Sequence, residues 1–144
     1  MDRAALSAIA GATTRADALA ERLAVASAEQ TVPAVGFVPD VELRLTAAPD
    51  EISVLAGAPS RVWRFTGQIV KGPADTLQTL PGSYLGPLIH LRRGQKVRIH
   101  FTNQLREDSI VHWHGMDVPE AADGHPRGVI RPGREYVDEF QVIN

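Results

Sequence analysis

The chain has 144 residues, enough for one folded domain, and its 44% hydrophobic and 22% charged content is ordinary for a globular protein. A net charge of −2 gives no reason to expect nucleic acid or an anionic membrane as a partner, and no apolar run is long enough to span a bilayer. Because there is no cysteine, disulfides, thiolate metal sites and cysteine nucleophiles are excluded within these residues.

Residues 1–32 differ in composition from the rest of the chain. They are rich in Ala, Leu, Arg and Glu, and Leu6, Ile9, Leu19 and Leu23 recur with a loose helical spacing. We expect a short helical arm over residues 1–32 that packs on the main body and takes no part in catalysis. The arm lacks the basic region and unbroken apolar core of an export signal.

From Pro33 the pattern changes to short β-strands. Apolar and polar residues alternate over 41–47, 61–70, 96–105 and 136–142, with Gly- and Pro-rich turn signals between these ranges. Short strands at this spacing predict an all-β sandwich or barrel. In the second range, Trp63, Phe65 and Ile69 are expected to share one apolar face. A complete sandwich needs more strands than these, so we expect residues 33–144 to be part of a larger folding unit.

The segment "IVHWHGM", residues 110–116, holds two of the five histidines. As a strand, it would point His112 and His114 to one face together with Met116, while Trp113 packs into the core from the other face. Two imidazoles at that spacing can reach one metal ion or two adjacent ions, and neutral imidazole suits copper, zinc, iron and nickel. A bare H-x-H pair is a weak signal because it arises often by chance on surface strands.

The context of the pair carries a more specific signal. The stretch "IVHWHGMDVPEAADGHPRGVIRPG" resembles the first copper motif of the multicopper oxidases, the laccase-like family, and "GSYLGPLIHLRRGQKVRIHFTNQL" before it is similar to the approach to that motif. The resemblance covers about residues 40–144. It implies a cupredoxin-like Greek-key β-sandwich, incomplete in this chain, in which residues 33–144 are the first part of cupredoxin domain 1.

The resemblance implies roles for three residues. His112 is expected to bind the type 2 copper of a trinuclear cluster, His114 one type 3 copper, and Asp123 to deliver protons to dioxygen as it is reduced. The family couples one-electron oxidation of a small reducing substrate, such as phenols, aromatic amines or metal ions, to four-electron reduction of dioxygen to water. A periplasmic or secreted location is typical of the family.

The chain departs from the family in its number of copper ligands. The trinuclear cluster takes four H-x-H pairs, of which this chain holds one, and the type 1 copper takes a cysteine, of which it holds none. The resemblance therefore implies a complementary C-terminal polypeptide that carries the remaining ligands. Without that polypeptide we expect no oxidase activity.

Two alternatives stay open. A cupin-type single-metal enzyme also uses H-x-H on a strand, with a glutamate three or four residues later. Here five residues separate His114 from Glu120, and Arg106 stands where a cupin usually has glycine, so the fit is poor. The other alternative is a non-catalytic cupredoxin-like module, which the presence of both histidines together with Asp123 argues against.

The remaining polar residues are weaker candidates. His125 is more often a solvated loop residue than a ligand, and His90 and His100 are expected at the surface or in hydrogen bonds. Glu120 ranks below Asp123 as a proton carrier. A basic run in the same loop is expected to be solvated; its members are Arg127, Arg131 and Arg134.

Overall fold

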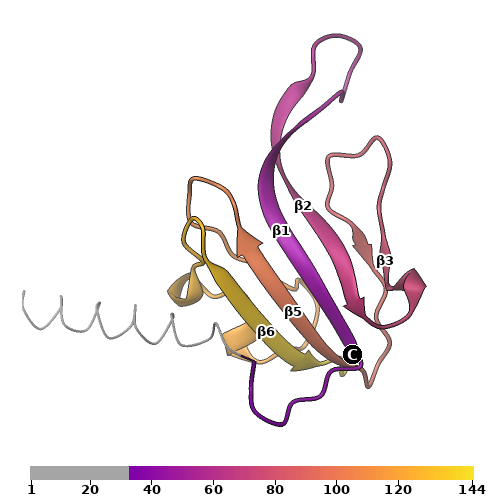
Figure 1. The fold of residues 1–144 in the computed structure, drawn as a ribbon, viewed down its shortest axis with the longest axis vertical. Helices are drawn as coiled ribbons and strands as arrows, with labels where there is room; N and C mark the ends of the chain where they lie inside the picture. Colours follow the sequence, from indigo (N-terminus) through magenta and orange to yellow (C-terminus); the bar gives the residue numbers. More distant parts are fainter. Residues whose placement is uncertain (1–32) are drawn as a thin grey trace, which may run out of the picture.

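The structure, a computed structural model, describes residues 33–144 (Figure 1), and the helical arm predicted over residues 1–32 lies outside the described residues. The strands are β1 (Val41–Ile52), β2 (Ser60–Lys71), β3 (Leu77–Gln78), β4 (Leu88–Ile89), β5 (Lys96–Asn103) and β6 (Glu135–Gln141), and the 3-10 helices are η2 (Ala74–Thr76), η3 (Glu120–Ala122) and η4 (Pro126–Gly128). Within residues 33–144 there is no α-helix, and no helix that could cross a bilayer.

The strands form two open sheets. A four-stranded sheet has the order β2-β1-β5-β6, and β3 and β4 pair as a separate two-stranded sheet. In the larger sheet β1 runs antiparallel to β2 but parallel to β5, and β5 runs antiparallel to β6. The prediction of a mostly β fold is confirmed for residues 33–144. Each of the four ranges with alternating residues overlaps one of the long strands β1, β2, β5 and β6.

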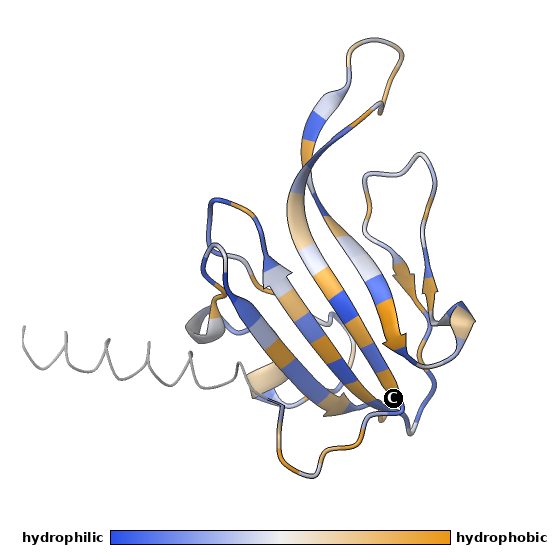
Figure 2. Cartoon of the chain, viewed as in Figure 1, coloured by the Kyte–Doolittle hydropathy of each residue, from blue (hydrophilic) through white to orange (hydrophobic). Residues whose placement is uncertain are grey.

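The core lies on one face of the four-stranded sheet. Alternation along β1, β5 and β6 sends every second side chain to this face, and Figure 2 shows the resulting change of hydropathy from residue to residue. The fully buried side chains include Val41, Leu43, Val97, Ile99 and Phe101. Burying such apolar surface is the main favourable term in folding, so these residues set which face of the sheet turns inward.

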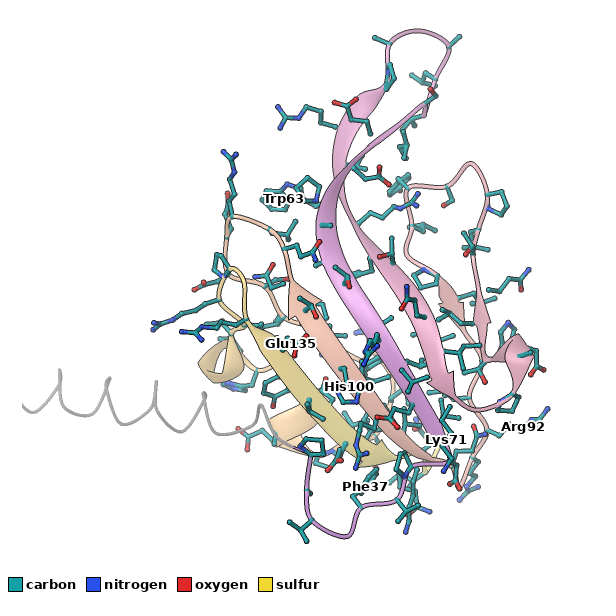
Figure 3. All side chains as sticks on the ribbon, in the orientation of Figure 1. Phe37, Trp63, Lys71, Arg92, His100 and Glu135 are labelled. Carbon is teal, nitrogen blue, oxygen red and sulfur yellow. The ribbon has the colours of Figure 1, made fainter. Side chains whose placement is uncertain are left out.

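The opposite face carries a network of charged side chains. Arg98 Nε lies 2.6 Å from Glu139 Oε1 and Arg98 Nη1 lies 3.7 Å from Glu42 Oε1, while Nη2 donates to the backbone oxygen of Phe37 at 2.7 Å. His100 Nε2 lies 2.6 Å from the same Glu42 oxygen. Figure 3 shows His100 and Phe37 on this side of the sheet. His100 is thus held in a hydrogen-bonded pair on the polar face.

The hairpin of β1 and β2 extends beyond the rest of the sheet (Figure 1). Pairing of β1 with β5 ends at Ala47, but its pairing with β2 continues past Pro49, which stands opposite Trp63. Trp63 is 59% exposed, although it shares the alternation of Phe65 and Ile69, which pack against the core. The apolar face predicted for β2 therefore packs against the core only along the part of the hairpin where β1 is also paired with β5.

Candidate metal centre

Residues 110–116 do not form the strand that their alternation predicted. Ser109 and Ile130 make an isolated antiparallel bridge, with N–H···O distances of 3.0 and 2.8 Å, and the chain leaves it without a further ladder. After Trp113 the chain turns, and the Met116 N–H donates to the Trp113 carbonyl oxygen at 2.9 Å. The prediction failed because alternation alone does not supply a neighbouring strand to pair with.

The two sides of the segment are still chemically distinct. Val111 and Trp113 pack against the core, and the Trp113 ring lies 5.4 Å from the ring of Phe140. His112 and His114 are exposed. Met116 packs against the core because of the turn, so it leaves the face of the histidines, where the alternation had placed it.

The structure brings the two imidazoles side by side. The ring centroids of His112 and His114 are 5.6 Å apart, with an angle of 66° between the ring planes. Metal–nitrogen bonds of about 2.0–2.1 Å would let rings at this separation bind one ion or two neighbouring ions. Both rings are open to groups outside residues 33–144, because they lie on the exposed side of the segment.

His112 is oriented by Asp123. Its Nδ1 lies 3.0 Å from the Asp123 backbone oxygen and 3.1 Å from the carboxylate Oδ1. Both oxygens are acceptors, so Nδ1 carries the hydrogen; it donates to the backbone oxygen, and the carboxylate adds attraction from the side. Nε2 is then left with its lone pair. Metal-binding histidines are typically held in this way, with one ring nitrogen tied to an oxygen and the other facing the metal.

The loop that carries Asp123 is fixed by contacts on both sides. Asp123 closes η3, where its N–H donates to the Glu120 oxygen at 3.3 Å, and the Tyr136 hydroxyl on β6 donates to the Ala121 oxygen. Ala122, within η3, is buried. Asp123 Oδ1 is buried without a protein hydrogen-bond partner within residues 33–144. A buried carboxylate oxygen without a partner can accept a proton, or a hydrogen bond from a group bound at the histidines.

Sequence reasoning missed one acid beside this segment. Asp138 on β6 is 4% exposed and shares the inward face with Tyr136 and Phe140. Burial raises the pKa of Asp138 to about 7, and repulsion by Asp123 adds to the rise, while interaction with the Trp113 side chain opposes it. The available signal was an acid at an inward position of a strand, which is rare without a specific reason.

The other polar residues do not complete a metal site. His90, His125 and Glu120 are exposed. Within residues 33–144, no three His, Asp or Glu side chains gather closely enough to hold an ion. Within the described residues, His112 and His114 could therefore supply only part of the ligand set of a metal ion. The side chain of Arg127 lies outside what the structure describes.

Known proteins with related sequences include multicopper oxidases, copper resistance proteins and a laccase. The chain is 43% identical over 75 residues to multicopper oxidase mco of Staphylococcus aureus. The aligned region covers 52% of this chain and 17% of the relative. It is 38% identical over 77 residues to a copper resistance protein A homolog of Pseudomonas syringae pv. tomato, and 32% identical over 100 residues to Laccase-2 of Oryza sativa subsp. japonica. These matches cover 51% and 60% of this chain, and 13% and 17% of the two relatives.

Solved structures agree with the sequence relatives. The McoA multicopper oxidase of the hyperthermophile Aquifex aeolicus superposes with a TM-score of 0.57 at 28% identity, over 75% of this chain and 21% of that one. A multi-copper oxidase of Pediococcus acidilactici gives a TM-score of 0.57 at 26% identity, with the same two coverages. The chain thus spans about a fifth of the length of these proteins.

The family model described as "Multicopper oxidase" matches residues 59–144. This range covers β2 to β6 together with the paired histidines and the loop of Asp123. The family match and the structural similarity identify the fold as cupredoxin-like. Proteins of this family bind copper. Because the matched range is more than half of the chain, the chain belongs to the multicopper oxidases.

Proposed function

We propose that this chain supplies two ligands to the trinuclear copper cluster of a laccase-like oxidase. His112 would bind the type 2 copper through Nε2, and His114 would bind one type 3 copper. The bound copper would supply the electrons for four-electron reduction of dioxygen to water, drawn from a small reducing substrate such as a phenol, an aromatic amine or a metal ion. The chain's own residues would bind the copper ions, orient the ligands and deliver protons.

One observation carries the proposal. The two imidazoles stand 5.6 Å apart on an exposed segment, and the Nδ1–H of His112 is held by Asp123. That arrangement fixes the ring plane and leaves Nε2 directed away from the protein oxygen. A surface histidine without function needs no such support.

Asp123 would carry protons in the same site. Reduction of dioxygen to two water molecules consumes four protons, and a carboxylate next to the cluster can pass them on. Its Oδ1 lies 3.1 Å from His112 Nδ1 but accepts no protein hydrogen bond within residues 33–144, so it can exchange protons without breaking one. The backbone oxygen of Asp123 does the orienting and its carboxylate the proton transfer.

The remaining ligands would come from complementary polypeptide outside these 144 residues. Residues 33–144 offer no third donor to the pair, and the chain has no cysteine for a type 1 copper. We therefore expect oxidase activity only when His112 and His114 face that complementary polypeptide. The type 1 site, and with it the choice of reducing substrate, would lie there.

The test is a His112→Ala substitution in the protein assembled with its complementary polypeptide. We expect loss of dioxygen consumption and of the type 2 copper signal in electron paramagnetic resonance, with the blue type 1 absorption retained. His90→Ala is the matched control, since His90 is an exposed histidine outside the candidate centre. Loss of the blue colour with the type 2 signal intact would contradict the assignment.

Metal analysis of the same preparation separates the alternatives. Several copper ions per assembly support the proposal. A single iron, manganese or zinc ion bound by this chain alone would instead indicate a cupin-type enzyme, and absence of any bound metal would indicate a non-catalytic module.

A further inference from the structure

The inward acid on β6 has no place in the function proposed above. Asp138 stands opposite Ile99 of β5, so its side chain points to the same buried face as Ile99. Its neighbours along that face are Tyr136 and Phe140. Burying a carboxylate among such side chains is costly unless a specific group interacts with it.

The indole of Trp113 offers a buried donor near this face. The Trp113 ring packs on Phe140, which is two residues from Asp138 on the same face of β6. Its Nε1 is buried and has no hydrogen-bond partner of normal geometry within residues 33–144. Interaction with the Trp113 side chain lowers the pKa of Asp138 against the larger effect of burial, which is consistent with an indole N–H close to the carboxyl group.

We propose that Asp138 is a positioning residue, whose carboxyl group accepts a hydrogen bond from the Trp113 indole and so fixes the direction of the two flanking histidines. This inference rests on the function proposed for His112 and His114. Trp113 lies between them in the chain, so contacts that hold its side chain also limit movement of the backbone on both sides. Packing on Phe140 limits the position of the ring plane, while the bond to Asp138 limits rotation within that plane.

An acid serves this role better than an amide. Above about pH 7 the carboxyl group of Asp138 is ionised, and hydrogen bonds to a charged acceptor are roughly twice as strong as those between neutral groups. The segment has no strand ladder beyond the Ser109–Ile130 bridge, so its position depends on side-chain contacts. Asp138 offers such a contact from β6, which is itself held by seven paired positions with β5.

The first experiment tests the pair in the chain itself. The chain has two tryptophans, so its two indole N–H resonances can be assigned with Trp63→Phe and Trp113→Phe. At pH 8, above the pKa of Asp138, Asp138→Asn should move the Trp113 resonance upfield and speed its hydrogen exchange. The matched control is Glu139→Gln, which removes a carboxylate from the same strand on the opposite face and should leave the resonance in place. An unmoved resonance in Asp138→Asn would overturn the pair.

The second experiment tests positioning in the copper-loaded assembly. Asp138→Val should weaken type 2 copper binding about 10–100-fold and change its paramagnetic resonance parameters, as removal of groups that orient metal ligands does elsewhere. Asp138→Asn, which keeps an acceptor oxygen, should restore most of the copper content; if Asp138→Val does not fold, Trp113→Phe removes the donor instead. Normal type 2 copper binding in Trp113→Phe, together with a shifted indole resonance in Asp138→Asn, would show that the hydrogen bond exists but does not position the histidines. That result would overturn the proposed role of Asp138. Failure of His112→Ala to deplete copper would refute the proposed function without affecting the first experiment.

Discussion

Gly124 lies against the backbone of Val111 so closely that no side chain fits between them. A Cβ on Gly124 would stand 2.0 Å from the Val111 oxygen and 3.1 Å from the His112 nitrogen, and Gly124 has a φ of +66°. Both features require glycine, one by space and the other by conformation. The contact sets the distance between the loop of Asp123 and the segment that carries His112.

Gly124→Ala should therefore push the loop away and separate Asp123 from His112. Left-handed strain and overpacking together should lower the free energy of unfolding by about 3 kcal/mol. Gly133→Ala is the matched control, because Gly133 has a φ of +73° with nothing within 4 Å of the added Cβ. It should cost only about 1–2 kcal/mol from strain. Urea unfolding measures the loss of unfolding free energy in both variants. Equal losses would show that the backbone at Val111 moves aside at no cost, and would contradict the prediction.

Asp123→Asn should slow the oxygen-reducing step while copper stays bound. The amide keeps the size of the side chain, and the backbone oxygen that orients His112 remains, but the amide cannot carry a proton. Transient reduction followed by reoxidation with dioxygen isolates this step, with a slowing of about 10²–10⁴-fold expected for loss of a general acid.

Glu120→Gln is the control for Asp123→Asn, because Glu120 is an acid in the same loop on the exposed side of η3. Its reoxidation rate should equal that of the unsubstituted protein. If Glu120→Gln slows reoxidation and Asp123→Asn does not, the proton carrier has been assigned to the wrong acid.

Asp138 should make the stability of the chain fall as pH rises. In the unfolded chain its pKa is about 3.9, and in the folded chain burial raises it to about 7. Between these values the folded state holds a proton that the unfolded state has released, so a rise in pH favours unfolding. Below about pH 4 and above about pH 7 the contribution is constant.

The measurement is urea unfolding of the chain at a series of pH values. Asp138→Asn should remove a decrease of at most roughly 4 kcal/mol between about pH 4 and pH 7. The difference in unfolding free energy between the two proteins should therefore grow across this window and level off above it. A difference that is the same at every pH would contradict the raised pKa.

The strands were predictable because their alternation matches the sheet that forms. Residues 41–47 and 96–103 have one buried side and one polar side in the sequence, and they lie as neighbouring β1 and β5 in the structure. The exposure of Trp63 could not be predicted the same way. It depends on where β5 ends beside the hairpin, which is a property of the assembled sheet.

The sequence indicates candidate residues for the site but not their geometry. The motif "HWHG" and the acid nine positions after its second histidine indicated His112, His114 and Asp123. The bond from His112 Nδ1 to the Asp123 backbone oxygen and the burial of Asp138 on β6 arise from packing between segments distant in sequence. Local spacing carries no information about such contacts.

The parallel pairing of β1 with β5 constrains the order in which the chain can fold. The β1–β2 hairpin joins strands that are close in sequence, whereas all of β2, β3 and β4 lies between β1 and its central partner. Hairpins close in microseconds, but non-local pairings wait for a long loop to close. During synthesis on the ribosome, the hairpin would thus emerge early with one edge of β1 unpaired, and that edge would stay open to chaperones until β5 had left the exit tunnel.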